Sequence, residues 1–200
     1  MQWAIWAAAA ALLATSAGAA RGGEFLVGAY AHDVTFIGDA IGVGAAGRED
    51  GVDLHLGVRS DRIEAFEIIG RPQAHAFVSI NSEGTSNFVA AGLSWPIDVT
   101  DRAYVRPGLG LAYTDGKVDL PPVNEPGLSP AEIARRLKLY NTRIDFGSHV
   151  LFQPEIAIGF RLSERVSAEL SWVHISNGNI LGSGKNQGMD DAGVRLIYAF

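Results

Sequence analysis

The sequence of 200 residues predicts an eight-stranded antiparallel transmembrane β-barrel with short periplasmic turns and longer external loops. From about residue 49 onward, apolar and polar residues alternate with a period of two, as they do in strands between lipid and a polar lumen. After the first 20 residues, no charge-free stretch is long enough for a membrane-spanning helix. Phe200 shares its parity with Val194, Leu196 and Tyr198, an ending that resembles the terminal strand recognised by the outer-membrane assembly machinery. A soluble β-sandwich with one wet face is the weaker alternative.

The beginning of the chain predicts export. Residues 1–20 have the pattern of a signal peptide, with an apolar run from Ile5 to Ala14 followed by the small residues Ala17-Gly18-Ala19, although no basic residue precedes Arg21. Residues 21–200 are expected to form one barrel domain in the bacterial outer membrane. The absence of cysteine excludes disulfides and thiolate metal sites, and a net charge of -6 argues against binding to nucleic acid.

Eight segments carry the strand pattern in chain order. The first is a weak strand at about 25–33, and in the second Val52, Leu54, Leu56 and Val58 alternate with polar residues or glycine. The other six segments are 74–81, 87–95, 103–113, 151–161, 166–176 and 190–200. Alternating chain direction then predicts periplasmic turns near 60–71, 96–101 and 162–165, and external loops near 34–48, 82–86, 114–146 and 177–189.

The polar faces of the later strands carry charges of both signs. Arg106, Glu155, Glu169 and Arg195 come from four consecutive strands. The interior of an eight-stranded barrel is filled by side chains, and buried charges need partners. These residues are therefore expected to form a paired network that fills the lumen.

One external loop contains a predicted helix. Ser129 followed by Pro130 and Glu132 is a typical helix start, and Ile133, Leu137 and Tyr140 follow near helical spacing among basic residues. Two interpretations stay open: an interfacial helix touching acidic lipid headgroups, or a simple ordered loop.

A candidate catalytic set lies at the external ends of the last two strands. His174 and Ser176 share a face with the apolar Trp172, and counting back in twos from Phe200 reaches Asp190. The three side chains are expected on the lipid-facing side, with His174 as base, Ser176 as nucleophile and Asp190 orienting the imidazole. Asn177 and the backbone amide of Gly178 are the candidate oxyanion donors. Asp191 has the opposite parity and should face the lumen.

These residues also resemble a known family. The His174-x-Ser176-Asn177 motif and the later Asn186-x-Gly188-x-Asp190 element are similar to those of PagL-like lipid A 3-O-deacylases, outer-membrane barrels that remove the ester-linked acyl chain at position 3 of lipid A. The resemblance covers roughly the C-terminal half and implies a serine esterase without a cofactor. The family pattern has glutamate where this chain has Asp190, which is one methylene shorter.

Two other functions remain as alternatives: a non-catalytic structural or adhesive barrel, and a barrel phospholipase or acyltransferase. The expected partners are lipid A or lipopolysaccharide of the outer leaflet and the assembly machinery, with a homodimer left open. No metal site is expected, because the histidines lack metal-ligand spacing and fit ordinary strand or loop positions; they are His32, His55, His75 and His149. Trp95 and Trp172 are expected to face lipid or anchor the interface.

Overall fold

The computed structural model describes residues 22–42, 45–182 and 184–200, so the predicted signal peptide lies outside the described residues. The strands are β1 (Gly23–Ala31), β2 (Val52–Arg62), β3 (Gln73–Asn81), β4 (Phe88–Ser94), β5 (Ile97–Asp98), β6 (Ala103–Thr114), β7 (Val150–Arg161), β8 (Val166–Ile175) and β9 (Met189–Ala199). The helices are α2 (Phe36–Ile41), the 3-10 helix η1 (Glu64–Ile69) and α3 (Pro130–Thr142). None of the helices in the described ranges is long and apolar enough to cross a membrane.

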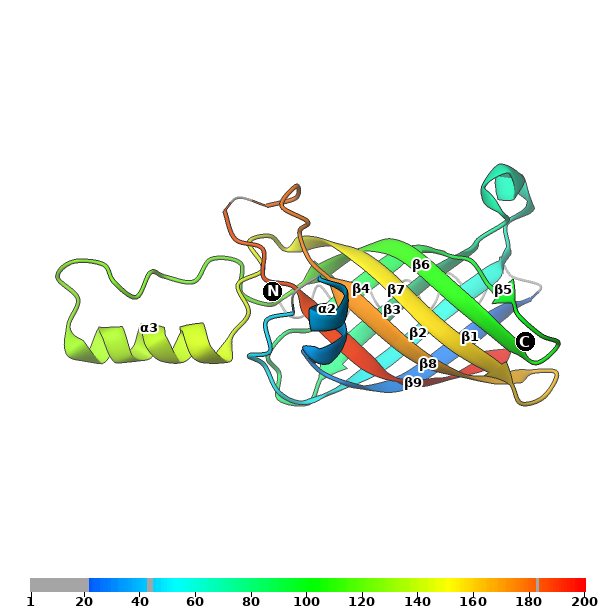
Figure 1. The fold of residues 1–200 in the computed structure, drawn as a ribbon, viewed down its shortest axis with the longest axis horizontal. Helices are drawn as coiled ribbons and strands as arrows, with labels where there is room; N and C mark the ends of the chain where they lie inside the picture. Colours follow the sequence, from blue (N-terminus) through cyan, green and yellow to red (C-terminus); the bar gives the residue numbers. More distant parts are fainter. Residues whose placement is uncertain (1–21, 43–44, 183) are drawn as a thin grey trace.

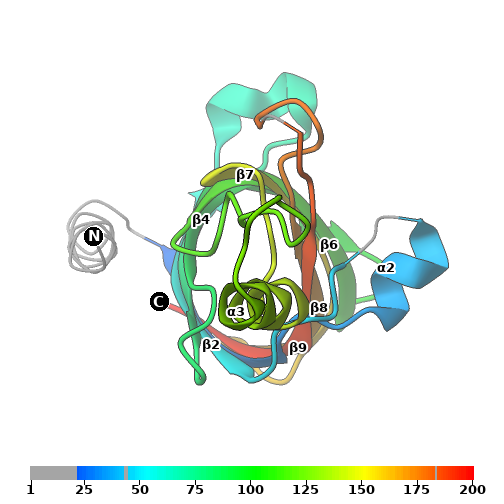
Figure 2. The same cartoon turned by 90° about the vertical axis from the view of Figure 1, so that its left-hand side faces the viewer.

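The long strands form a closed antiparallel barrel (Figures 1 and 2). Neighbouring strands pair in chain order, β1 pairs with β9, and pairing of β4 with β6 bypasses the two-residue β5 to close the barrel. All eight predicted strands are confirmed, and β5 is a small addition within the turn near 96–101. The predicted fold class is therefore correct.

The two faces of the wall differ as the alternation predicts. Leu170 of β8 and its register partner Val194 of β9 are 62% and 61% exposed on the outer surface, whereas Glu169 and Arg195 are buried inside. The outer surface between the two rims is thus apolar, as lipid contact requires.

The predicted charge network fills the lumen near the end of the barrel at which β9 ends and the C-terminal Phe200 lies. Arg195 donates to both Glu155 and Glu169, and Arg106 Nε lies 3.0 Å from Glu169 Oε1. Arg59 also pairs with Glu169, and the Tyr104 hydroxyl donates to the same carboxylate at 2.9 Å. Each of these side chains is almost fully buried, and each charge has a partner of opposite sign.

Local boundaries differ from the expectations in two places. The first strand ends at Ala31, two residues before the predicted end at 33, because the chain turns at Asp33, which has a φ of 50°. The turn predicted near 60–71 contains η1. The helix predicted in the long loop is confirmed as α3: the Ser129 hydroxyl accepts the Glu132 amide at 3.2 Å, and Pro130 occupies the first helical position.

The barrel has two unlike ends. Glu24 of β1 pairs with Ala199 of β9, so the first and last strands start and finish at the same end, where the connections are short. The longer loops gather at the opposite end, from which α3 projects along the barrel axis (Figure 1). None of the residues of α3 is buried. The predicted catalytic residues lie at this loop-bearing end, which we call the outer rim.

Candidate active site at the outer rim

His174 and Asp190 form a hydrogen-bonded pair. They are direct partners in the antiparallel register of β8 and β9, and His174 Nδ1 lies 2.6 Å from Asp190 Oδ1. Opposed residues of such a pair project their side chains to the same face of a sheet. The carboxylate engages Nδ1, so Nε2 of the imidazole faces away from Asp190 and is the nitrogen that a substrate or nucleophile can use.

Ser176 lies on the same face as His174. Val173 and Ile175 point inward and belong to the apolar core at this end of the lumen, so the intervening and following residues point outward. Although β8 ends at Ile175, Ser176 remains extended because its amide and carbonyl both pair with Phe152 of β7, at 3.2 and 2.7 Å. The side chain of Ser176 is partly exposed. Within the described residues, no hydrogen bond joins its hydroxyl to His174. Hydrogen bonds between catalytic groups often form only when substrate binds.

The His–Asp pair is covered, and in this respect the sequence expectation needs correction. Both residues have the predicted outward parity, but His174 is only 6% exposed and Asp190 is fully buried. The segment after β1 lies along the start of β9: the Val34 amide donates to the Asp190 carbonyl at 2.8 Å, and the Ala46 amide donates to Gly188 at 2.9 Å. Helix α2, which belongs to this segment, lies outside the barrel wall (Figures 1 and 2). The pair is therefore shielded from lipid on this side.

Asn177 organises the loop beside Ser176. Its side-chain amide donates to the carbonyl oxygens of Phe146 and Lys185 at 2.7 and 2.5 Å, while its backbone amide donates to Asn186 Oδ1 at 2.9 Å. Every N–H of Asn177 is thus engaged within the protein. Direct donation to an oxyanion, as the sequence predicts, requires one of these bonds to open, and it stays a prediction.

Gly178 follows in a left-handed conformation. Its φ is +61°, and an added Cβ would lie 3.0 Å from Phe152 Cδ2. Glycine adopts this conformation without the steric cost that other residues carry. Gly178 is exposed, and the residue before it is fixed by the hydrogen bond from the Asn177 side chain to the Phe146 carbonyl. The Gly178 amide is therefore the oxyanion candidate that this loop presents.

A second polar cluster lies on the inner side of the wall. Asp191 faces the lumen as predicted, where its Oδ2 lies 3.3 Å from His55 Nε2. His32, directly after β1, bonds through its ring to Asp53 at 2.9 Å and to Glu49 at 3.3 Å. Burial alone would lower the pKa of His32, but these carboxylates outweigh burial and raise the pKa to about 10. Spacing along the sequence does not show this cluster, because its members come from the segment between β1 and β2, from β2 and from the distant β9.

The remaining predicted side chains are also placed. His75 is buried in the lumen and its Nε2 lies 3.0 Å from Gln153 Oε1, while His149 contacts the Thr114 carbonyl at 2.8 Å near the outer rim. Trp172 is partly exposed on the outer face, with its ring 6.0 Å from that of His174. Trp95 is partly exposed near the opposite end, and its indole donates to the Ile69 carbonyl at 2.7 Å.

A closed barrel with an apolar outer face and a polar lumen defines an outer-membrane β-barrel protein, and here the outer rim carries a histidine–carboxylate pair beside a serine. Comparison with family models then identifies the chain: the model described as lipid A 3-O-deacylase (PagL) matches residues 74–199, more than half of its length. The chain belongs to this family. It is accordingly an outer-membrane barrel of a lipid A deacylase family, as the sequence motifs suggest.

Solved structures agree on the fold. The crystal structure of the outer membrane enzyme PagL superposes with a TM-score of 0.53 at 14% sequence identity, covering 88% of this chain and 98% of that chain. The N-terminal β-barrel domain of Pseudomonas aeruginosa OprF superposes with a TM-score of 0.50 at 9% identity, covering 90% and 98%. No curated protein matches the sequence.

Proposed function

We propose that this protein is a serine esterase that removes the ester-linked acyl chain at position 3 of lipid A in the outer leaflet. The observation that carries the proposal is the 2.6 Å bond between His174 Nδ1 and Asp190 Oδ1, with Ser176 two residues further along the same face. Membership of the lipid A 3-O-deacylase family supports the substrate. The chemical roles follow from the residue types and their placement.

The first half of the reaction transfers the acyl group to the protein. His174 Nε2 accepts the proton of the Ser176 hydroxyl as Ser176 Oγ forms a bond to the ester carbonyl carbon. Asp190 keeps the Nδ1–H tautomer in place and stabilises the imidazolium that forms. When the carbon–oxygen bond to the sugar breaks, His174 returns the proton to the sugar oxygen, and the acyl chain remains on Ser176.

The second half releases the fatty acid. A water molecule gives one proton to His174 Nε2 while its oxygen bonds to the acyl carbon. The Ser176–acyl bond then breaks, and Ser176 Oγ takes the proton back. In both halves negative charge develops on the carbonyl oxygen, where the Gly178 amide is the proposed donor. Asn177 contributes by holding the loop that presents this amide.

The outer wall beside the site suits an acyl chain. An apolar depression lies over β8, β9, β1 and β2, and Leu170 and Val194 are among the residues that line it. These two residues are register partners that lie four residues along the strands from the His174–Asp190 pair, with Trp172 and Ala192 between them on the same face. At a rise of about 3.3 Å per residue, the depression begins roughly 13 Å from the pair. A fatty acyl chain bound at Ser176 can therefore lie along an apolar surface.

The decisive experiment is mass spectrometry of lipid A. The full chain is expressed in a bacterium whose lipid A carries the 3-O-acyl group, and folding is checked by heat-modifiable migration in electrophoresis. We expect a lipid A species lighter by one acyl chain in cells with the wild-type protein, and only the unmodified species in cells with Ser176→Ala.

The same experiment separates the alternatives. Unmodified lipid A from cells with a folded wild-type barrel contradicts the proposal and favours a non-catalytic barrel. Loss of acyl chains from phospholipid, with lipid A intact, identifies a phospholipase instead. If Ser176→Ala still deacylates lipid A, the reaction stands but the serine mechanism is wrong.

A further inference from the structure

A buried cluster of metal-ligand type lies inside the barrel at the outer rim. His32 Nδ1 is 2.9 Å from Asp53 Oδ2 and 3.7 Å from Asp191 Oδ1. The three residues belong to the segment after β1, to β2 and to β9, and one potential ligand atom from each lies within 4.8 Å of the others. All three side chains are almost completely shielded from solvent.

One oxygen in this cluster is without a hydrogen-bond partner. Asp191 is 1% exposed, and its Oδ1, the atom directed at His32, has no hydrogen-bond partner among the described residues. A buried carboxylate oxygen without a hydrogen bond is costly, and the 3.7 Å contact with His32 Nδ1 is too long to be one. This oxygen points to a ligand, independently of the presence of several acidic groups.

Asp53 and Asp191 also contact residues outside the proposed ligand set. Asp53 accepts hydrogen bonds from Ser79 Oγ at 2.9 Å and Asn81 Nδ2 at 2.8 Å, and Asp191 Oδ2 lies 3.3 Å from His55 Nε2. Metal ligands in proteins typically have such outer partners, which fix their orientation.

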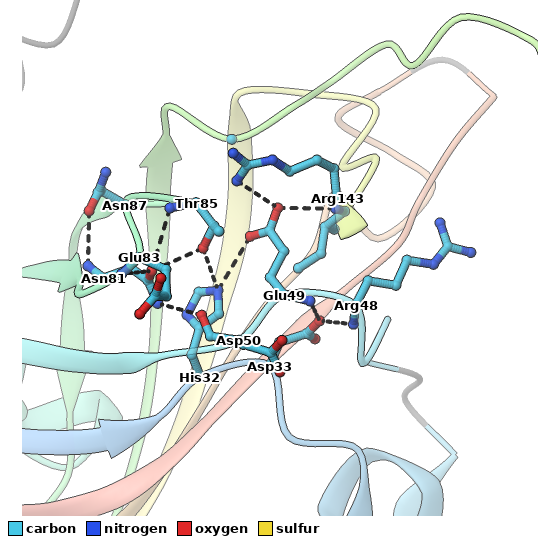
Figure 3. Close-up of polar contacts among 12 residues, drawn as sticks. His32, Asp33, Arg48, Glu49, Asp50, Asn81, Glu83, Thr85, Asn87 and Arg143 are labelled. Carbon is cyan, nitrogen blue, oxygen red and sulfur yellow. Dashed lines mark hydrogen bonds and ion pairs between the residues drawn. The ribbon is translucent and has the colours of Figure 1, made fainter. Parts of the chain in front are cut away.

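The imidazole of His32 is oriented from its other nitrogen. His32 Nε2 lies 3.3 Å from Glu49 Oε2 and 3.5 Å from Thr85 Oγ1, as Figure 3 shows. A carboxylate on one imidazole nitrogen leaves the other for a metal, and this carboxylate–histidine–metal arrangement is common. Here the nitrogen left for the metal is Nδ1, the one that faces Asp53 and Asp191.

The charges of the cluster also favour a cation. Glu49, Asp53 and Asp191 surround His32, and Arg143 Nη1 lies 3.7 Å from Glu49. Asp33 adds a further carboxylate, which accepts the backbone amides of Arg48 and Glu49 (Figure 3). Carboxylates thus outnumber the cations in a region closed to water.

We propose that this cluster binds one divalent transition-metal ion of the Zn²⁺ class through His32 Nδ1, Asp53 Oδ2 and Asp191 Oδ1. The ion takes the place of the proton on Nδ1. One imidazole with two carboxylates suits Zn²⁺ or its neighbours, whereas Ca²⁺ and Mg²⁺ prefer all-oxygen sites. Bonds of about 2.0–2.1 Å in a tetrahedral site place ligand atoms about 3.3 Å apart, so only small shifts are needed.

The bound ion is expected to stabilise the fold and not to take part in the proposed ester hydrolysis. Asp191 follows Asp190, so an ion bound to Asp191 ties the start of β9 to the segment after β1 and to β2. The ion lies on the lumen side of the wall, and Asp190 pairs with His174 on the other side. We therefore assign the ion a structural role at the base of the active site.

Binding is tested on the full chain, refolded in detergent without a polyhistidine tag and freed of metal by a chelator. Calorimetric titration with ZnCl₂ is expected to show one ion per chain, and Co²⁺ is expected to produce a single visible absorption spectrum that Zn²⁺ abolishes. His32→Gln and Asp53→Asn should lose this binding, and Glu49→Gln should weaken it about 10- to 100-fold, the usual effect of removing an outer partner. The matched control is His149→Gln, which removes a histidine near the same rim and should bind as the wild type does.

Two outcomes overturn the proposal. One is a folded wild-type barrel that binds neither Zn²⁺ nor Co²⁺ at one ion per chain. The other is equal binding by the wild type, His32→Gln and Asp53→Asn, which places the ion elsewhere. Should those two variants not fold, Glu49→Gln and the wild-type Co²⁺ spectrum decide the question, because unchanged affinity in Glu49→Gln or a spectrum without an imidazole ligand contradicts the assigned ligands.

Discussion

Asp190 and Asp191 are consecutive residues of β9, yet their carboxylates lie on opposite sides of the barrel wall. Asp190 Oδ1 is 2.6 Å from His174 Nδ1 on the outer side, and Asp191 Oδ2 is 3.3 Å from His55 Nε2 in the lumen. Side chains of a regular strand alternate between its two faces, so one step along the chain separates the two environments. The proposed active site and the proposed metal site therefore share one strand without sharing a side chain.

Asp190→Ala should slow lipid A deacylation by on the order of 10²-fold or more, because the imidazole loses the group that sets its tautomer and orientation. Asp190→Glu should retain activity, since it restores a carboxylate of the type expected in the family motif. The rates are measured with purified barrels in mixed micelles of lipopolysaccharide and detergent, from the release of fatty acid.

Asp191→Asn provides the comparison for Asp190. It removes a charge from the adjacent residue but leaves the His174–Asp190 bond intact, so its effect on the rate should be much smaller than that of Asp190→Ala. A larger rate loss in Asp191→Asn than in Asp190→Ala is incompatible with Asp190 as the acid of the site.

Gly178→Ala should lower the deacylation rate, by up to roughly 10²- to 10³-fold if the Gly178 amide is the oxyanion donor. The substitution strains a φ of +61° and brings the new Cβ 3.0 Å from Phe152 Cδ2, which displaces this amide. The fall should appear in kcat, because the oxyanion forms only in the transition state.

Gly184→Ala is the matched control in the same loop. Gly184 has a φ of +85° and no heavy atom within 4 Å of an added Cβ, so this variant carries backbone strain alone. We expect its kcat to stay within about threefold of wild type, since one strained backbone position costs on the order of 1 kcal/mol and that cost falls on the loop. Equal losses in the two variants assign the effect to loop strain and remove Gly178 from the oxyanion role.

The barrel and the faces of its strands are predictable because one face of each strand contacts lipid and the other faces the polar lumen. Alternation along β8 and β9 correctly places Leu170 and Val194 outside and Arg195 inside. The same alternation predicts the outward parity of His174 and Asp190 and the inward parity of Asp191, since no irregularity in the pairing of β8 with β9 interrupts it.

The surroundings of the site are not predictable in the same way. His174 is buried because a segment more than a hundred residues earlier in the chain crosses the start of β9 at Val34 and Ala46. The three hydrogen bonds that engage Asn177 likewise depend on loop conformation and on partners as distant as Phe146. Local periodicity carries no information on contacts between loops. The strand face on which His174 and Asp190 lie can therefore be inferred from the sequence, whereas the segment that covers them cannot.

Replacing residues 122–142 with a short Gly-Ser linker should leave the stability of the barrel nearly unchanged. This segment contains α3, none of whose residues is buried, and the buried Leu120 and Ile144 on either side are retained. Loop length changes closure entropy only slowly, so the free energy of unfolding in urea should shift by less than about 1 kcal/mol. A loss of several kcal/mol means that α3 packs on the barrel, contrary to its exposed position.

Arg195→Met should destabilise the barrel by about 3–5 kcal/mol, because it removes a buried guanidinium that pairs with both Glu155 and Glu169 and leaves Glu155 with only the longer 3.7 Å contact to Arg59 among the described arginines. The measurement is equilibrium unfolding in urea of the protein refolded into phospholipid vesicles. The matched control is Arg161→Met, which removes an ion pair with Asp98 at the surface, where the side chains are 37% and 58% exposed. Exposed pairs contribute at most about 1 kcal/mol, so this variant should unfold at nearly the wild-type urea concentration. Equal and small effects in both variants rule out the lumen network as a major source of stability, since they imply that water or protons compensate the two glutamates.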